Sequence, residues 1–351
     1  MVPKSALILA GGRGTRFWPK SQPQRPKQML DLFGGGKTLI EGTISRIEGL
    51  VEKEQVFIST SSDLLHPLKE LTHFPLQQFF IEPISKNTAP AIGLAATYIM
   101  KKFGDRVMIV LPSDHRIDPI STFQKQIEQA AQLAWERNIL VCFGIPPTRP
   151  ATGYGYIRLS TSLGGDVYSV DKFVEKPDRM TAEGYLAQGN YLWNAGIFIW
   201  RASAILEAIH EYLPPLSDLL KEVQKGIGTQ REEEAIHHIF KNAPSISIDF
   251  GVMEHHQNVF ALRAGFMWDD LGSWESLTNY LPREKDNWSN TNELTTLNAQ
   301  NNIVDVKGKR VALLGVNDLL IVETEDTLLV SSRKDSEKVG ELIALLPQDG
   351  S

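Results

Sequence analysis

The sequence is almost free of cysteine: Cys142 is the only one in 351 residues. A single thiol excludes an intrachain disulfide framework and a zinc site built from several thiolates. The eight histidines contain no His-Glu-x-x-His pattern, so a helical zinc site is not expected either. A chain with so little cysteine suits a reducing compartment, and we expect a cytoplasmic protein.

Long apolar runs and excess positive charge are also missing. No stretch approaches the roughly 20 apolar residues that span a bilayer, and the N-terminal run ALILA is too short for the core of a signal peptide. The formal net charge is −6, which excludes a basic surface spread over the whole molecule. We therefore expect no membrane span and no nucleic-acid partner, and any basic site must be local.

The first 145 residues alternate between two patterns. Helix-like amphipathic segments at 38–50, 87–103 and 119–137 separate apolar, β-rich runs, which are SALILA, QVFIST, FFIEP, RVMIVLP and ILVCFGI. Repeated β-α units predict an α/β fold of the Rossmann-like kind, with a mostly parallel sheet and helices on both faces. In such sheets ligands bind beyond the carboxyl ends of the strands.

The pattern changes twice further along the chain. Beyond about residue 150 come longer strands, a helical block at roughly 202–242 and two more expected strands, SISIDF and VFALRAGFMW. We interpret this part as an insertion that covers the open edge of the sheet. The asparagine-rich stretch KDNWSNTNELTTLNAQNN indicates a linker to short β-rich runs. The predicted division is a larger domain at 1–284 and a small C-terminal β domain at 285–351.

The local basic site is LILAGGRGTRFWPKSQPQRPKQMLD at residues 7–31. Its glycines follow a strand and allow backbone N–H groups to turn toward an anion, while Arg16 and Lys27 supply charge-assisted hydrogen bonds. The loop lacks the spacing of a dinucleotide fingerprint or a phosphate loop, and a solvated surface bend remains the alternative. We expect Lys20 and Arg25 to be solvated. A second glycine run, GGGKT at 34–38, is expected to be a turn that leads into a helix.

Two carboxylates end apolar strands: Asp114 follows VMIVLPS, and Asp270 lies in MWDDLGSW. Paired carboxylates without histidine or thiolate suit Mg²⁺, which takes its other ligands from water and substrate phosphates. Each aspartate alone is more commonly a turn former or a helix cap. Asp269 and Asp270 also resemble the acidic pair of metal-dependent glycosyltransferases, a weaker alternative. Asn194, inside an apolar strand, is either a satisfied core group or a ligand contact.

Nine motifs together resemble the sugar-nucleotide pyrophosphorylase family, and within it the branch that uses mannose 1-phosphate and GTP. They occur in the family's order and cover nearly the whole chain. They are LAGGRGTRFWP, RPKQ, EPISKNTAPAI, PSDH, GYGYI, FVEKP, WNAGIF, SIDFGVME and WDDLGSW. The chain departs from the pattern at Phe250, Gly251 and His255, where relatives commonly have Tyr, Ala and Lys, and this puts a role for position 255 in doubt.

The resemblance implies a Rossmann-like nucleotidyltransferase domain followed by a small left-handed β-helix. It implies that mannose 1-phosphate attacks the α-phosphorus of GTP with the help of Mg²⁺, giving GDP-mannose and pyrophosphate. A homodimer is one assembly that it allows. The alternatives are a related enzyme with another sugar or base, and a non-catalytic sensor of nucleotide sugars.

The same resemblance assigns roles to individual residues. The catalytic set is Arg16, Lys27, Asp114, Lys176 and Asp270, of which the two aspartates bind the metal ion. The nucleotide-binding set is Leu9, Ala10, Gly11, Gly12, Arg13, Gly14, Thr15, Glu82, Asn87, Thr88, Ala89 and Ser113. The sugar-phosphate set is Gly155, Glu175, Lys176, Asn194 and Asp249.

Overall fold

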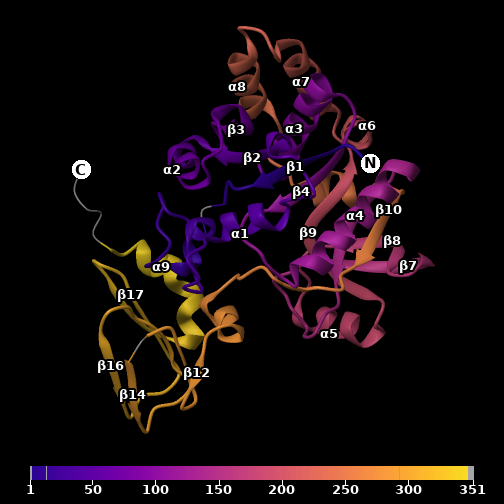
Figure 1. Ribbon diagram of the computed structural model, residues 1–351. Coiled ribbons are helices and arrows are strands. Elements are labelled where there is room, and N and C mark those ends of the chain that lie inside the picture. The colour runs from indigo at the N-terminus through magenta and orange to yellow at the C-terminus, as the bar shows by residue number, and fades with distance from the viewer. Residues whose placement is uncertain (1, 13, 292, 347–351) are drawn as a thin grey trace. The chain divides into compact units, whose positions relative to one another are not determined.

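The computed structural model describes residues 2–12, 14–291 and 293–346. The chain divides into two compact units, and each is assembled from three segments of sequence. Unit 1 comprises Met1–Gly11, Thr43–Ser113 and Ile117–Trp268, and unit 2 comprises Gly12–Gly42, Asp114–Arg116 and Asp269–Ser351. In the colours of Figure 1, unit 2 contains indigo residues of the segment 12–42 together with the yellow C-terminal segment.

Unit 1 is built on a nine-stranded sheet with the order β3-β2-β1-β4-β9-β6-β10-β8-β7. Parallel pairs join β1 to β2 and β4, β2 to β3, and β6 to β10, whereas β9 runs antiparallel to β4 and β6. The strands are β1 (Lys4–Leu9), β2 (Val56–Ser61), β3 (Phe79–Glu82), β4 (Val107–Pro112), β6 (Leu140–Ile145), β7 (Tyr156–Gly164), β8 (Val167–Val174), β9 (Tyr191–Arg201) and β10 (Val259–Arg263). This confirms the predicted α/β class with a mixed sheet.

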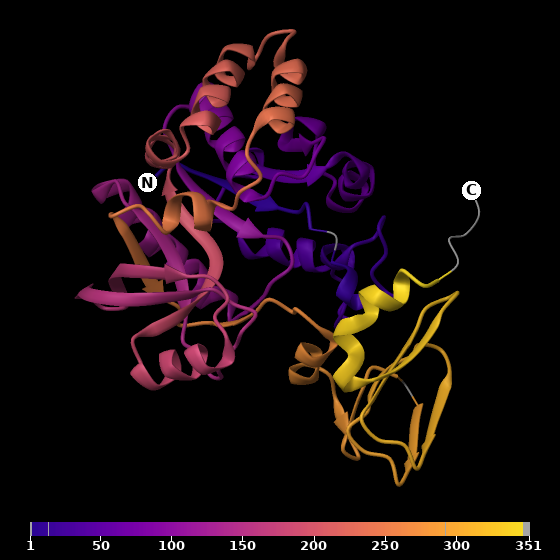
Figure 2. The same cartoon turned by 180° about the vertical axis from the view of Figure 1, so that it is seen from behind.

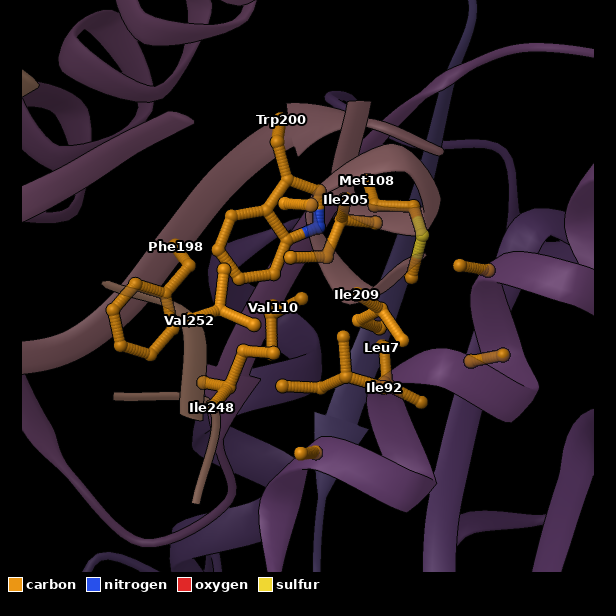
Figure 3. Close-up of a cluster of buried hydrophobic side chains, with 14 of the residues drawn as sticks. Leu7, Ile92, Met108, Val110, Phe198, Trp200, Ile205, Ile209, Ile248 and Val252 are labelled. Atoms are coloured by element: carbon orange, nitrogen blue, oxygen red, sulfur yellow. The ribbon is translucent and has the colours of Figure 1, made fainter. Parts of the chain in front are cut away.

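Both faces of the sheet are covered. Leu7, Met108 and Val110 point to one face, where they pack with Ile92 and Ile209 in the cluster of Figure 3. Their neighbours in sequence, such as Ile8 and Ile109, point to the other face and are equally buried.

The helices are α1 (Leu39–Arg46), α2 (Ser62–Thr72), α3 (Thr88–Phe103), α4 (Ile120–Arg137), α5 (Arg179–Gln188), α6 (Ala202–Tyr212), α7 (Pro214–Gly226), α8 (Glu232–Asn242) and α9 (Val339–Ile343).

Helix α3 packs against α6 and α7, and α7 packs against α8, as the view from behind shows (Figure 2). Helix α4 packs instead against β4, β6 and β9. None of the helices in the described part of the chain is both long and apolar enough to cross a membrane.

Two expectations for the middle of the chain are wrong. The inserted segment does not cover the sheet edge: β9 enters the sheet between β4 and β6, and β8 and β7 extend it. The expected strand SISIDF is irregular and then a single π-helical turn, Asp249–Met253. Its backbone groups bond to the start of α3, since Ala89 N donates to Ile246 O at 3.1 Å and Ile248 N to Thr88 Oγ1 at 2.9 Å. The alternation of apolar and polar residues in SISIDF therefore belongs to a segment that bonds to the start of α3, and not to a strand.

The C-terminal part of unit 2 is a short β-helix in which successive coils stack in parallel. Strand β13 pairs with β15, β15 with β17, and β14 with β16, all parallel, while β12 and β18 add antiparallel edges. The strands are β12 (Arg283–Glu284), β13 (Asn287–Ser289), β14 (Glu293–Leu297), β15 (Ile303–Asp305), β16 (Arg310–Leu314), β17 (Leu319–Glu323) and β18 (Leu328–Ser332). Two short strands, β5 (Arg116–Asp118) and β11 (Met267–Asp269), lie where the chain passes between units.

The asparagine-rich stretch is part of this β-helix and not a linker, which corrects the sequence interpretation. Asn287 and Asn302 are fully buried. Asn302 Nδ2 donates to Asn287 Oδ1 at 2.7 Å, and Asn302 Oδ1 accepts from Leu319 N at 2.9 Å. The amides thus connect one coil to the next and satisfy backbone groups that the turns leave unpaired.

The main apolar core of unit 2 draws on both ends of the sequence. Residues near the glycine loop and residues after Asp270 form a single buried cluster. It contains Phe17, Leu30, Leu32, Leu39, Leu271, Trp274, Leu277, Leu281, Ile303, Leu320, Val322, Leu329 and Val339. The glycine loop is therefore held by the same core as the β-helix.

Candidate active site

The glycine loop of unit 2 lies directly against Lys27. Gly14 has φ of +49°, and a Cβ there would be 2.6 Å from Lys27 Cβ and 3.0 Å from Lys27 N, so only glycine fits. Gln28 Nε2 donates to Gly12 O at 2.9 Å and fixes the start of the loop. Thr15 begins the 3₁₀ turn Thr15–Phe17, and Arg13 lies outside the described residues.

The ammonium of Lys27 joins the three segments of unit 2. Lys27 is 6% exposed, and its Nζ lies 2.8 Å from Asp114 Oδ2 and donates a short hydrogen bond to the backbone oxygen of Asp270. A buried charge needs such partners to offset the loss of hydration. Three residues predicted to be catalytic, from sequence positions far apart, therefore meet at one atom.

Asp114 is held in its charged form. Burial is the largest single influence and pushes its pKa upward, but the charges of Lys27 and His115 and the hydrogen bond from Lys27 together outweigh it, and the net pKa lies below the ordinary value. His115 Nε2 is 3.9 Å from the other carboxylate oxygen. The carboxylate therefore stays ionised at neutral pH, as a metal ligand must be.

Asp270 and Arg16 meet at Gly272. Arg16 Nη1 donates to Gly272 O at 3.2 Å, and a Cβ on Gly272 would lie 3.2 Å from Asp270 Oδ2 and 3.6 Å from Arg16 Nη1. The absence of a side chain at Gly272 lets the guanidinium and the carboxylate share this space. Leu271, between them, has φ of +48° and is fully buried, so core packing holds an uncommon backbone conformation.

Asp269 and Asp270 are neighbours in sequence but differ in their surroundings. Both carboxylate oxygens of Asp269 accept protein donors, from Leu271 N at 2.8 Å and Tyr280 Oη at 3.1 Å. Asp269 therefore serves as an acceptor for donors of its own turn and of Tyr280. Burial raises the pKa of Asp269, partly offset by these hydrogen bonds.

The second glycine run is a turn that leads into a helix, as expected. The Asp31 carboxylate accepts from the backbone N–H groups of Phe33, Gly35 and Gly36 at 2.8–3.2 Å. These N–H groups therefore bind a side chain of the protein itself and not an external anion. Thr38 and Glu41 then form a reciprocal capping box at the start of α1.

The two remaining loop cations behave differently from each other. Arg25 is exposed, as expected. The expectation for Lys20 is wrong, because its ammonium pairs with the buried carboxylate of Asp305 in the β-helix.

The sugar-phosphate candidates gather in unit 1. Gly155 O accepts from Asn194 N at 2.8 Å, and a Cβ on Gly155 would lie 3.2 Å from Glu175 Oε2. Asn194 Nδ2 donates to Asp249 Oδ1 at 2.6 Å, and its own Oδ1 accepts from Gly196 N at 3.0 Å. These contacts fix the orientation of the Asn194 amide.

Lys176 belongs to the same group of residues. Its Nζ lies 3.2 Å from Glu175 Oε1, and both side chains are more than half exposed, so the pair contributes little to stability. Lys176 has φ of +27°, an uncommon conformation for a residue with a side chain. The backbone thus presents an exposed cation beside Glu175.

The nucleotide candidates of unit 1 lie at strand ends and at the start of α3. Ala10 N donates to Ser59 O at 2.8 Å, and Ser113 N donates to Leu9 O at 3.1 Å. Glu82 Oε1 accepts from Ser59 Oγ at 2.7 Å, and a Cβ on Gly11 would lie 3.8 Å from the same oxygen. Burial raises the pKa of Glu82, and the Ser59 hydrogen bond counteracts it.

Asn87 caps α3, since its side chain accepts from Thr88 N at 2.9 Å. Thr88 and Ala89 bond to the segment that leads to Asp249, as described above for Ile246 and Ile248. Their polar groups are thereby used within the fold. Sequence reasoning missed the structural roles of Gln28 and Gly272, although both stand inside the quoted motifs RPKQ and WDDLGSW.

Among the described residues no group of three or more His, Cys, Asp or Glu side chains could hold a metal ion. Lys27 links the Asp114 carboxylate to the backbone oxygen of Asp270, so the two residues predicted to bind a metal ion belong to one arrangement. Two carboxylates suit a hard cation that takes its remaining ligands from water and substrate phosphates.

The raised pKa of Asp249 predicts that the stability of the protein depends on pH. Burial is the main cause that raises its pKa to about 6, with Glu175 and Glu254 adding repulsion and the Asn194 hydrogen bond opposing them. Because the folded state then binds a proton more tightly than the unfolded state, Asp249 lowers the free energy of unfolding as pH rises from about 4 to 6. We expect Asp249→Asn to remove this part of the slope in urea unfolding measured from pH 4 to 7.

The exposed Asp218, whose pKa is lowered by Lys221, is the control. Asp218→Asn should keep the Asp249 contribution. Equal slopes for wild type and Asp249→Asn would contradict the burial of this carboxyl group.

The fold and the strand-end loops place the protein in the class of α/β nucleotidyltransferases with an attached β-helix. A family model described as nucleotidyl transferase matches residues 5–286. A second, described as mannose phosphate isomerase/GMP-like beta-helix domain, matches residues 292–346. The chain therefore belongs to the nucleotidyl transferase family.

Named relatives agree with this. The chain is 35% identical to a mannose-1-phosphate guanylyltransferase of Sinorhizobium fredii, over 99% of this chain and 69% of the relative. It is 36% identical to one of Klebsiella pneumoniae, over 98% and 74% of the two chains. A solved structure from Thermus thermophilus, titled mannose-1-phosphate geranyltransferase, matches with a TM-score of 0.87 and 31% identity over 97% of this chain and 98% of that one.

Proposed function

We propose that the protein is a mannose-1-phosphate guanylyltransferase, which converts GTP and α-D-mannose 1-phosphate into GDP-mannose and pyrophosphate. The observation that carries this proposal is the meeting of Lys27, Asp114, Asp270 and Arg16 in unit 2. Cations beside two carboxylates suit the transfer of a charged phosphoryl group, where positioning and charge neutralisation supply most of the catalysis. The names of the relatives support the choice of GTP and mannose 1-phosphate.

The glycine loop and its cations would hold the triphosphate. Backbone N–H groups of Gly11, Gly12 and Gly14 can point toward an anion, and Arg13, Arg16 and Lys27 would stabilise the departing pyrophosphate. Lys27 already neutralises Asp114, so a bound phosphate would have to share this ammonium. Leu9, Ala10, Thr15 and Ser113 complete the proposed nucleotide-binding set.

The chemistry needs no general base. A phosphate monoester has a second pKa of about 6, so the attacking oxygen of mannose 1-phosphate is already ionised near neutral pH. The task of the protein is to bring this oxygen into line with the leaving pyrophosphate.

Asp114 and Asp270 would hold a divalent ion, which nucleotidyltransferases of this family generally use, and we propose Mg²⁺. The residue types fit, because two carboxylates leave coordination positions for phosphate oxygens and water. When bound, Mg²⁺ would neutralise charge on the α-phosphate and the sugar phosphate. Lys27 keeps Asp114 ionised and ready for this role.

The sugar would be recognised by the residue group of unit 1. Lys176 would bind the phosphate of mannose 1-phosphate, while Gly155, Glu175 and Asn194 address the sugar hydroxyl groups. Asp249 would orient Asn194 through the hydrogen bond of 2.6 Å. We assign the guanine pocket to the start of α3 and the end of β3, which contain Glu82, Asn87, Thr88 and Ala89.

We further propose residues 1–284 as the catalytic domain and 285–351 as the β-helix domain, a division that the ranges of the two family models support. A cytoplasmic location is proposed from the single cysteine. A homodimer is proposed on the resemblance to the family alone.

A pyrophosphate-release assay tests the substrates. Four nucleoside triphosphates are each combined with mannose, glucose and N-acetylglucosamine 1-phosphate at fixed Mg²⁺. We expect GTP with mannose 1-phosphate to give the highest kcat/KM, because hydrogen-bonding pockets discriminate strongly between bases and between sugars. A better rate with any other pair would overturn the assignment, and no turnover with any pair would favour a sensor.

The metal role of Asp270 is tested by Asp270→Asn. The backbone oxygen that accepts from Lys27 stays in place, so unit 2 should keep its fold while kcat falls by about 10² or more. Asp286→Asn, at an exposed aspartate of the β-helix, should leave kcat unchanged. An unaltered kcat in Asp270→Asn would remove this residue from the mechanism.

A further inference from the structure

The three segments of unit 2 meet at Lys27 and also at a second point, where the guanidinium of Arg116 contacts two aromatic rings. Arg116 Cζ lies 4.3 Å from the ring centroid of Phe33 and 4.4 Å from that of Tyr280. The two rings meet edge to face, with centroids 5.5 Å apart, so the guanidinium fills the corner between them. Each of the three residues comes from a different segment of the unit.

Tyr280 also reaches the turn that carries Asp270. Its Oη donates to Asp269 Oδ2 at 3.1 Å, and Asp269 Oδ1 accepts from Leu271 N at 2.8 Å. Asp269 therefore closes a tight turn around Asp270. Leu271, with φ of +48°, requires such support, because this conformation costs free energy in a residue with a side chain.

These contacts form one continuous path between the two candidate metal ligands. Asp114 lies two residues before Arg116, whose guanidinium contacts Tyr280. Tyr280 bonds to Asp269, which is bonded covalently to Asp270. Lys27 connects the same two aspartates at a different point, through a carboxylate of one and a backbone oxygen of the other.

We propose that Arg116, Tyr280 and Asp269 form a brace, which fixes the separation of the Asp114 and Asp270 carboxylates and so sets the affinity of the site for its divalent ion. The proposal rests on the metal role in the proposed function. The three are positioning residues. Both carboxylate oxygens of Asp269 are engaged by the protein, so the brace acts on the turn and not by direct ligation.

The expected size of the effect follows from the chemistry of such supports. Loss of a group that orients a metal ligand typically costs about 10- to 100-fold in metal affinity or activity. A structural contact far from the site would instead change the melting temperature and leave the metal dependence alone. The metal dependence therefore distinguishes the brace from ordinary packing.

The test compares Tyr280→Phe, Arg116→Gln and Arg116→Lys with wild type. Tyr280→Phe keeps the ring beside Arg116 and removes the hydrogen bond to Asp269. We expect it and Arg116→Gln to raise the Mg²⁺ concentration at half-maximal velocity by about 10-fold, with little change in KM for mannose 1-phosphate. Arg116→Lys keeps a cation over the rings, so the Mg²⁺ concentration at half-maximal velocity should rise less than in Arg116→Gln.

Arg283→Gln is the matched control, because Arg283 also lies over a ring, that of Trp288 at 5.2 Å, but in the β-helix. It should leave the Mg²⁺ dependence unchanged. The double variant Arg116→Gln with Tyr280→Phe should raise the Mg²⁺ concentration at half-maximal velocity by about as much as the more severe single variant, because both substitutions act through one path.

A second readout does not need the proposed substrates. Binding of Mn²⁺ alone, followed by electron paramagnetic resonance, should weaken about 10-fold in Tyr280→Phe and Arg116→Gln but not in Arg283→Gln. This result would support the brace even if the substrate panel rejected GTP and mannose 1-phosphate. Equal Mn²⁺ affinity and equal Mg²⁺ dependence in all variants would overturn it.

Discussion

Unit 2 depends on the interactions that the buried ammonium group of Lys27 makes. This group is a buried charge, and its partners are the Asp114 carboxylate and the backbone oxygen of Asp270. Removing a charge from water is costly unless both its charge and its hydrogen bonds are satisfied. One lysine therefore constrains three distant segments of sequence to meet, and the glycine loop follows because Gly14 lies in contact with the Lys27 main chain and side chain.

The β-helix takes part in this arrangement through the shared core of unit 2. Phe17 and Leu30, which both follow the glycine loop in sequence, pack in the same cluster as Leu320 and Val322 of β17. Lys20 adds a polar link to Asp305. The C-terminal domain thus supports the loop that we assign to triphosphate binding, and its role is wider than an appended packing module.

Much of the fold was predictable because it depends on local patterns. The five apolar runs of the first 145 residues became β1, β2, β3, β4 and β6, and the helix-like segments became α1, α3 and α4. Cations beside a glycine loop and carboxylates at strand ends were enough to make Arg16, Lys27, Asp114 and Asp270 candidates, and the family resemblance assigned their roles. These residues needed no knowledge of their partners to be recognised as suited to phosphate and metal chemistry.

The errors arose where a distant partner decides the outcome. Ile246 and Ile248 alternate with polar residues as in a strand, but their backbone groups bond to the start of α3. Asn302 looks like a linker residue until Asn287 is found one coil away. Tyr280 lies outside the quoted motifs, and its contacts with Arg116 and Asp269 emerge only in the folded structure.

A double-mutant cycle on Lys27 and Asp114 tests the central claim most directly. Lys27→Met, which keeps the apolar stem, and Asp114→Asn should each lower the free energy of unfolding, by roughly 1–3 kcal/mol, because each removes the ion pair between these two side chains. The double variant should cost clearly less than the sum of the two. Additive effects, or a Lys27→Met variant as stable as wild type, would contradict the account.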